Sequence, residues 1–249
     1  MQEYKFLKKL RSENPLVHCI TNIVVANFQA NGLLALGASP IMADAIEEVA
    51  EMSAISSCTV LNIGTLRRDT VTAMLLAGKS ANEQGVPVVL DPVGAGATVF
   101  RKETVSKILK EINISLIRCN AGELAAIAGI EWSARGVDAG EGQADISTIA
   151  KEMAQKLGCL IAVTGEIDIL TDGTRLLEIS GGHSLMSKVT GSGCLLSAVA
   201  GAFLAISNKN DFEAVAEALS FYKKAGESAS ENASAPGQFA VHFLDELAN

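Results

Sequence analysis

Short aliphatic runs alternate with longer amphipathic segments along the chain. The runs are bounded by Gly, Pro or Asp, and they predict buried strands near residues 16–20, 58–63, 86–91, 114–118 and 159–164. A hairpin is predicted across 167–180, around the turn Thr171-Asp172-Gly173-Thr174. Helical spacing of apolar residues predicts helices near 25–36, 43–56, 69–84, 101–111, 121–129, 144–157, 193–207 and 211–232.

This alternation indicates the fold class. Continuous Val, Ile and Leu strands that alternate with helices are typical of a mainly parallel sheet covered by helices on both faces. No internal repeat or linker divides the chain, and the loop near 133–143 is its one low-complexity stretch. A length of 249 residues suits one α/β domain. We therefore expect a single α/β domain over residues 1–249.

Composition raises the question of a membrane protein, because 49% of the residues are apolar, 19% are charged and the mean hydropathy is +0.30. The longest apolar run, Cys194–Ile206, has 13 residues, whereas a spanning helix needs about 20. The N-terminal segment lacks the apolar stretch of a signal peptide. A net charge of −8 disfavours non-specific nucleic-acid binding. We expect a soluble cytoplasmic protein with neither a membrane nor a nucleic acid as partner.

The five cysteines are scattered, and none has C-x-x-C spacing, so we expect neither a zinc site nor a disulfide framework. Four of them lie in apolar runs, where a cysteine usually acts as a small buried hydrophobe. Cys194 is different because it follows a glycine-rich segment.

Polar and glycine residues follow each predicted parallel strand. In such sheets, ligands bind beyond the carboxyl ends of the strands. Five consecutive clusters at these positions therefore indicate one shared site. The clusters are Thr21-Asn22, Asn62–Thr65, Asp91–Thr98, Arg118–Glu123 and Thr164–Glu166.

The segment Val189-Thr190-Gly191-Ser192-Gly193-Cys194 leads directly into the 13-residue apolar run. Glycines at a helix start expose backbone N–H groups, and the helix N-terminus adds partial positive charge, which suits an anion. A plain glycine turn that caps a helix is the alternative. The pattern is neither a dinucleotide fingerprint nor a Walker A loop. The same helix field is expected to lower the pKa of the Cys194 thiol.

Other polar residues at the strand ends have both a chemical and a structural interpretation. Asp91 and Glu123 suit Mg²⁺ beside substrate phosphates, or they serve as a helix cap or loop anchor. Arg118 suits a triphosphate, or it pairs with a neighbouring acid. Thr164 binds phosphate or makes the turn after its strand. His18 lies inside an apolar strand and is interpreted as a core histidine rather than a base.

Five segments together resemble the hydroxyethylthiazole kinases of thiamine salvage, which have the ribokinase-like α/β fold. The resemblance covers nearly the whole chain. The segments are Pro15–Asn22, Asn31–Ala43, Leu90–Ala97, Ile117–Glu123 and Val189–Cys194. It implies a three-layer sandwich and ATP-dependent phosphorylation of the hydroxyl of 4-methyl-5-(2-hydroxyethyl)thiazole. It also implies a homotrimer with active sites between subunits.

The resemblance further implies roles for individual residues. Met42 would contact the thiazole, with Asn22 and Gly64 nearby, and Gly191 would lie beside the hydroxyethyl arm. The ATP phosphates would be held by Arg118 and Thr164. Mg²⁺ would be organised by Asp91 and Glu123. Two departures from the family pattern, Cys119 where Gly is expected and Gly122 where Ser is expected, affect the segment around Arg118.

Relatives across the wider fold have an Asp as the base at the position of Cys194. We hypothesise that Cys194 orients the hydroxyl and accepts its proton late, which contributes about 10²-fold to the rate. Two other functions stay open. One is a lyase of the same fold that repairs hydrated nicotinamide cofactors with ATP or ADP, and the other is a trimeric binding protein without turnover.

Overall fold

The computed structural model describes residues 4–130 and 141–249. Their strands form one sheet in the order β2-β1-β3-β4-β5-β6-β7-β8. Strands β1 to β6 are parallel, and β7 and β8 add an antiparallel hairpin. The strands are β1 (Leu16–Ile20), β2 (Ser39–Ile41), β3 (Cys58–Asn62), β4 (Val88–Asp91), β5 (Leu116–Cys119), β6 (Leu160–Val163), β7 (Asp168–Thr171) and β8 (Leu176–Ile179).

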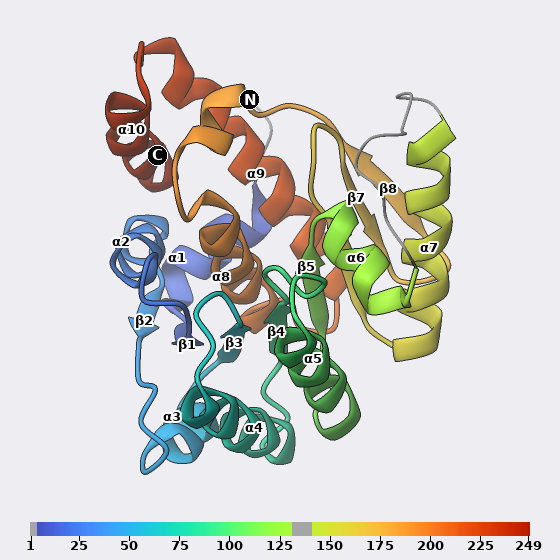
Figure 1. Cartoon of the computed structure of the whole chain (residues 1–249). Helices are drawn as coiled ribbons and strands as arrows, with labels where there is room; N and C mark the ends of the chain where they lie inside the picture. The colour runs from blue at the N-terminus through green and yellow to red at the C-terminus, as the bar shows by residue number, and fades with distance from the viewer. Residues whose placement is uncertain (1–3, 131–140) are drawn as a thin grey trace.

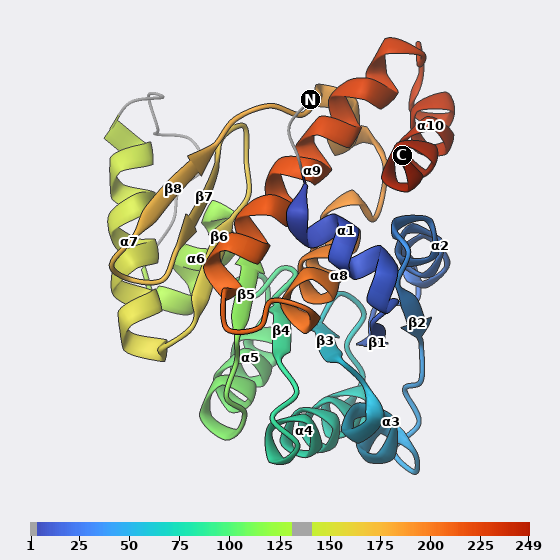
Figure 2. The same ribbon diagram turned by 180° about the vertical axis from the view of Figure 1, so that it is seen from behind.

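Helices cover both faces of this sheet, which gives three layers (Figures 1 and 2). One face packs against α1 (Lys5–Glu13), α2 (Ala26–Leu36), α8 (Ser192–Ala205) and α9 (Asp211–Glu231), with the 3-10 helix η1 (Ser184–Lys188) and α10 (Pro236–Ala248) on the same side. The other face carries α3 (Val49–Ile55), α4 (Arg68–Glu83), α5 (Val99–Glu111), α6 (Ala121–Ala128) and α7 (Glu141–Leu157).

Alternate residues of each strand enter two separate hydrophobic cores. Val60 and Val89 pack with α8 on one face, whereas Leu61 and Leu90 belong to the core on the other face. Successive side chains of a strand point to opposite faces, and both faces are covered here. This explains why the strands are continuous apolar runs in the sequence rather than alternating ones.

The predicted parallel strands and the hairpin around Asp172-Gly173 are confirmed. The prediction of a helix over 43–56 is partly wrong, because only Val49–Ile55 is helical. The carbonyl of Ala43 accepts a hydrogen bond from a ring nitrogen of His18 instead of a helical N–H. The three-residue strand β2 and the helices α1 and α10 were not predicted from the sequence. Part of the predicted loop near 133–143 lies outside the described residues.

No helix among the described residues combines the length and the apolar character that a membrane crossing requires. The most apolar helix, α8, is buried within the protein, where its side chains pack against β1, β3 and β4. Many of the small aliphatic residues are therefore buried in the core, where the strands and α8 pack together.

Candidate active site

The polar clusters predicted after the parallel strands lie along one edge of the sheet. From β2 to β6, this edge carries Met42, Asn22, Asn62, Asp91, Arg118 and Thr164. Neighbouring strands are about 4.8 Å apart, so five steps across the sheet separate the two ends of this row by about 24 Å. Five of these residues were predicted from the sequence to lie at one edge, whereas the position of Met42 after β2 and the order across the sheet were not.

Asp91 is the buried centre of this row. Its side chain is fully buried, and its Oδ2 accepts hydrogen bonds from Asn62 Nδ2 at 2.7 Å and Ser197 Oγ at 2.8 Å. Oδ1 has no hydrogen-bond partner and lies 3.8 Å from Arg118 Nη1. Burial raises the pKa of Asp91 even though Arg118 opposes the shift. One carboxylate oxygen thus remains available to a cation.

Arg118 joins Asp91 to the end of β6. Its Nη2 donates a hydrogen bond of 2.5 Å to Thr164 Oγ1, while its buried Nε has no partner. Burial lowers the pKa of Arg118, but the carboxylates of Asp91 and Glu123 outweigh this effect and raise it above its ordinary value. Gly193 permits this packing, because a Cβ there would lie 2.9 Å from the guanidinium nitrogens and would displace them.

Cys194 lies in the first turn of α8 and is connected to Asp91 through Asn22 and Asn62. Its Sγ accepts a hydrogen bond of 3.5 Å from Asn22 Nδ2, which also donates to Asn62 Oδ1 at 3.0 Å. Burial and the charge of Asp91 raise the pKa of the Cys194 thiol to about 11. The expectation of a lowered pKa is therefore wrong, because desolvation outweighs the helix N-terminus. The thiol is neutral at pH 7.

Glu123 has a well-defined structural role at the start of α6. Its Oε2 accepts from the backbone N–H of Asn120 at 2.9 Å, and the Glu123 N–H donates to Asn120 Oδ1 at 2.9 Å, which forms a capping box. Its Oε1 accepts from the Gly94 N–H at 2.8 Å. Glu123 therefore fixes the loop after β4 against α6, and its charge acts on Asp91 and Arg118.

Two predicted glycines allow close packing near Asn22 and Cys194. Gly191, the residue before α8, has φ of +96°, and a Cβ there would lie 2.9 Å from Val25 Cγ1. At Gly64, a Cβ would lie 2.6 Å from Asn22 Nδ2. Met42 follows the edge strand β2 and packs against the core that contains α8. His18 is fully buried and bonds Ser53 and Ala43, which supports the core interpretation.

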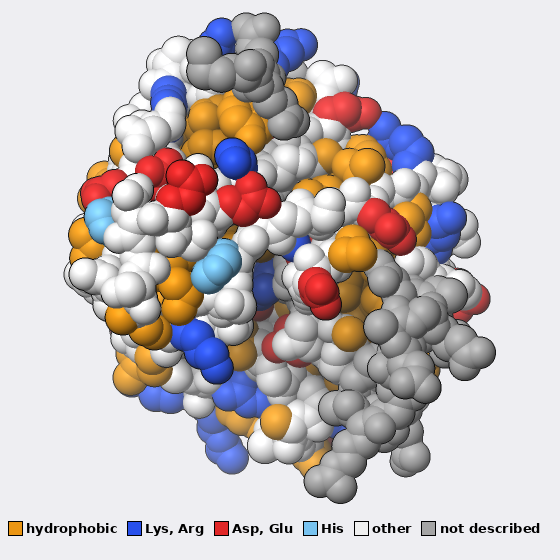
Figure 3. All heavy atoms as spheres, turned by 90° about the horizontal axis from the view of Figure 1, so that it is seen from above, with side chains coloured by type: hydrophobic (Ala, Val, Ile, Leu, Met, Phe, Trp, Pro, Cys, Tyr) orange, Lys and Arg blue, Asp and Glu red, His pale blue; other side chains and the backbone are white. Residues whose placement is uncertain are grey.

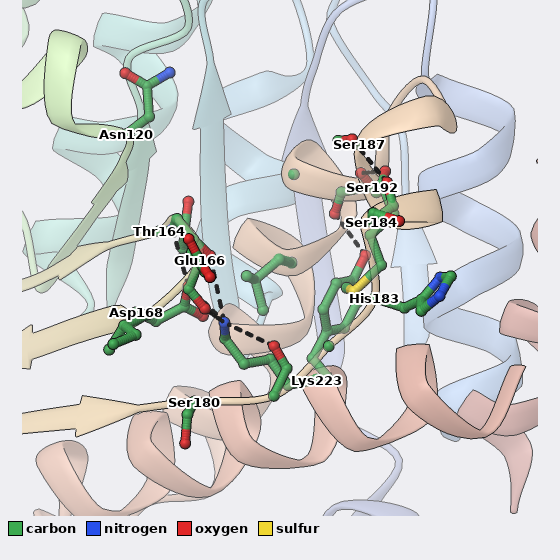
Figure 4. Close-up of a pocket in the computed structure, with 18 of the residues that line it drawn as sticks. Asn120, Thr164, Glu166, Asp168, Ser180, His183, Ser184, Ser187, Ser192 and Lys223 are labelled. Atoms are coloured by element: carbon green, nitrogen blue, oxygen red, sulfur yellow. Dashed lines mark hydrogen bonds and ion pairs between the residues drawn. The ribbon is translucent and has the colours of Figure 1, made fainter. Parts of the chain in front are cut away.

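A cavity of about 920 Å³ opens beside Arg118 and Thr164. Figure 3 looks onto this edge of the sheet and shows a hollow with basic side-chain atoms inside it. The wall also contains Gly165, Gly181, Ser192, Tyr222 and Lys223, of which Ser192 and Lys223 are labelled in Figure 4. Its size is in the range of pockets for small molecules. Met42, Asn22 and Gly64 do not line it, because they lie further along the edge.

Three further residues belong to this site but were not assigned a role from the sequence. Asn62 and Ser197 hold Asp91, and the Tyr222 hydroxyl donates to the Ser192 carbonyl at 2.5 Å. Asn62 ends an apolar strand, and Ser197 interrupts an apolar helix three residues after Cys194. A polar residue that interrupts an apolar pattern is the signal that could have identified both.

Comparison with known proteins shows similarity in both sequence and fold. Residues 7–249 match the model of the hydroxyethylthiazole kinase family. Hydroxyethylthiazole kinase from Haemophilus influenzae (strain 86-028NP) is 55% identical over 244 residues, which cover 98% of this chain and 92% of that protein. Hydroxyethylthiazole kinase from Exiguobacterium sp. (strain ATCC BAA-1283 / AT1b) is 53% identical over 244 residues, which cover 98% of this chain and 92% of that protein.

Solved structures agree with these sequence matches. Hydroxyethylthiazole kinase from Pyrococcus horikoshii OT3 superposes with a TM-score of 0.90 at 40% identity, covering 98% of this chain and 92% of that one. A ribokinase-like superfamily protein from Enterococcus faecalis, at 12% identity and a TM-score of 0.67, shares the fold alone. The ribokinase-like three-layer fold is thus confirmed. With the match over residues 7–249, these findings show that the chain belongs to the hydroxyethylthiazole kinase family.

Proposed function

We propose that this protein transfers the γ-phosphoryl group of ATP, with Mg²⁺, to the hydroxyl of 4-methyl-5-(2-hydroxyethyl)thiazole, a reaction of thiamine salvage. Family membership supports the reaction type and the substrate. The observation that carries the proposal is a continuous row of polar contacts from the cavity wall to Cys194. Arg118 forms an ion pair with Asp91, and Asn62 donates a hydrogen bond to Asp91. Asn22 then donates to both Asn62 and Cys194. This row can hold a phosphate donor at one end and an alcohol at the other.

The cavity suits the nucleotide. Arg118 and Thr164 lie in its wall, and 13% of the Arg118 side chain is exposed there. Phosphoryl transfer proceeds through a loose transition state, so positioned positive charge contributes more than proton removal. Arg118 would stabilise charge on the transferred phosphoryl group, and Thr164 would fix the guanidinium orientation.

The residues present fit a magnesium ion held mainly by ATP. Among the described residues, no cluster of three or more His, Cys, Asp or Glu side chains is arranged to hold a metal. Mg²⁺ commonly uses one or two carboxylates together with phosphates and water, and Asp91 has a buried Oδ1 free of hydrogen bonds. The ion would neutralise charge on the phosphates. Asp91 would hold it, and Glu123 would act indirectly by fixing the loop after Asp91.

Cys194 orients the hydroxyl in this proposal. With a pKa of about 11, the thiol keeps its proton at neutral pH and cannot act as a strong base. A neutral thiol can still donate or accept a weak hydrogen bond to an alcohol. Asn22 bonds the Cys194 sulfur and fixes it beside Asn62 and Asp91.

A homotrimer with shared sites would explain the position of Met42. This residue lies at the far end of the row from the cavity, about 24 Å across the sheet from Thr164. Ile23 and Val24, which follow Asn22, are 78% and 66% exposed, as expected of residues that a second copy covers. Met42 would then contact the thiazole in a neighbour's site. Light scattering should give about three times the chain mass of 25.9 kDa, and a 25.9 kDa particle would refute the trimer.

One assay separates the candidate functions. MgATP consumption is measured with the thiazole alcohol, with NADH hydrate and with neither substrate. Of these three conditions, we expect MgATP to be consumed only with the thiazole alcohol. The protein would act in the cytoplasm, where ATP is available. Turnover of NADH hydrate would favour the lyase, whose fold is shared by the ADP/ATP-dependent NAD(P)H-hydrate dehydratase of Bacillus subtilis (TM-score 0.63, 13% identity). ATP binding without turnover would indicate a binding protein.

A further inference from the structure

Lys223 places a buried ammonium group in the wall of the large cavity. The residue is 6% exposed, although lysine is rarely buried without a partner. Its Nζ lies 3.3 Å from Asp168 Oδ1 and donates to the carbonyls of Glu166 at 2.9 Å and of Gly165 and Gly181 at 3.3 Å. Figure 4 shows the side chain pointing from α9 toward this group of oxygens.

The four oxygens come from two separate segments that line the cavity. Gly165 and Glu166 lie in the connection between β6 and β7, and Asp168 is the first residue of β7. Gly181 follows β8. Asp168 Oδ1 also accepts the N–H of Gly165 at 3.0 Å, which tightens the first connection. The ammonium group therefore ties two loops together at the cavity wall.

These contacts leave Lys223 without capacity for a phosphate. An ammonium group has three N–H donors, and here they are shared among four protein oxygens. Arg118, in contrast, lies in the same wall with its side chain 13% exposed, and it donates one hydrogen bond, to Thr164. The two cations thus have different functions: Arg118 can contact a bound phosphate, whereas Lys223 fixes the loops that form the cavity wall.

Lys223 also compensates the charge of Asp168. This carboxylate is 3% exposed and close enough to Arg118 for the two charges to interact. Without Lys223, a buried negative charge would stand in the cavity wall, where it would repel an incoming triphosphate and compete with it for Arg118. Burial of an unpaired charge is strongly unfavourable, so the loop would also shift toward water.

We propose that Lys223 is a positioning residue for the nucleotide. It fixes the loops after β6 and β8 and neutralises Asp168, so that Arg118 and Thr164 are presented to the phosphates. This inference depends on the proposed function for the identity of the nucleotide, but its consequence is a change in nucleotide affinity rather than in the chemical step.

The test measures ADP binding by calorimetry alongside steady-state kinetics. Lys223→Met should weaken ADP binding about 10-fold to 50-fold and raise the KM for ATP by a similar factor. The KM for the thiazole alcohol should stay within about twofold, and kcat at saturating ATP within about threefold. Lys224→Met is the matched control: Lys224 is the next residue on α9, is 58% exposed and pairs with Glu227. It should change no value more than about twofold.

A double variant distinguishes positioning from general destabilisation. If the charge of Asp168 causes part of the defect, Lys223→Met with Asp168→Asn should bind ADP more tightly than Lys223→Met alone, which gives a measurable coupling. If Lys223→Met does not fold, the double variant, which removes the two charges together, is compared with wild type. Weaker ADP binding, from the lost tie between the two loops, supports the role, and unchanged ADP affinity overturns it.

The possible results separate this inference from the proposed function. Unchanged ADP affinity in Lys223→Met, with an active wild-type enzyme, would overturn the role of Lys223 and leave the kinase assignment intact. Lys223-dependent ADP binding in a protein that does not phosphorylate the thiazole alcohol would support the role and overturn the kinase assignment. Absence of ADP binding in the wild type would overturn both.

Discussion

Replacing Asp91 by Asn tests the centre of the site, because it removes one buried charge and preserves the shape of the side chain. Asp91 Oδ1 and Arg118 Nη1 are 3.8 Å apart, and at an effective dielectric constant of about 20 their attraction is about 4 kcal/mol. The desolvation of the carboxylate outweighs this attraction, because the pKa of Asp91 is raised, so the loss of stability comes from Arg118, which the variant leaves buried without the charge of Asp91. We therefore expect the free energy of unfolding to fall by about 1–3 kcal/mol.

The expected loss of activity in this variant is larger than the loss of stability. Positioned charge in an active site typically contributes about 10²-fold to 10³-fold to kcat. Asp91→Asn also removes the anionic oxygen proposed to hold Mg²⁺. We expect kcat/KM to fall about 10³-fold and the Mg²⁺ concentration for half-maximal rate to rise at least about tenfold.

The assay is a Mg²⁺ titration of ATP turnover with thiazole alcohol, with a urea melt to measure stability. Ser197→Ala is the matched control, because it removes one hydrogen bond to Asp91 Oδ2 and leaves the charge in place. Its kcat/KM should stay within about tenfold, with unchanged Mg²⁺ dependence. A normal Mg²⁺ dependence in Asp91→Asn would refute the assignment of Asp91 to the metal.

Three other predictions concern Cys194, His18 and Gly191. Cys194→Ala should lower kcat about 10²-fold or less, and a full kcat in steady-state assays would show that the thiol does not orient the hydroxyl. Burial lowers the pKa of His18, so the unfolded chain binds its proton at a higher pH than the folded one; stability measured by urea melts should fall as the pH drops below about 6.5, and less so in His18→Gln. Gly191→Ala should lower the melting temperature and kcat together, because φ is +96° and the new Cβ would lie 2.9 Å from Val25; unchanged values of both would contradict this.

Much of the fold follows directly from the sequence. Apolar runs such as Val88–Leu90 have no polar face, so they require cover on both sides, and this predicts a parallel sheet between two helical layers. The helix predicted near 121–129 ends at a glycine, and in the structure this Gly129 follows α6 with φ of +75°. These features depend on local pattern and backbone preference, which a sequence shows.

Other elements depended on tertiary contacts. β2 has three residues and exists because it pairs with β1 at the edge of the sheet. Residues 43–48 have a helical pattern, yet Ala43 bonds His18 instead. A local pattern cannot anticipate a partner that lies far away in the chain.

The sequence by itself determined which residues gather at the carboxyl edge of the sheet, and the match to the family was already visible in its motifs. Only the tertiary structure decided what surrounds each of them. Burial makes Cys194 a neutral thiol with a pKa of about 11, although its position at a helix start suggested the opposite. Burial likewise leaves Asp91 with one unpartnered oxygen and turns Lys223 into a fixed internal cation. The physical reason is that desolvation and pairing depend on neighbours from distant segments, which the order of residues does not specify.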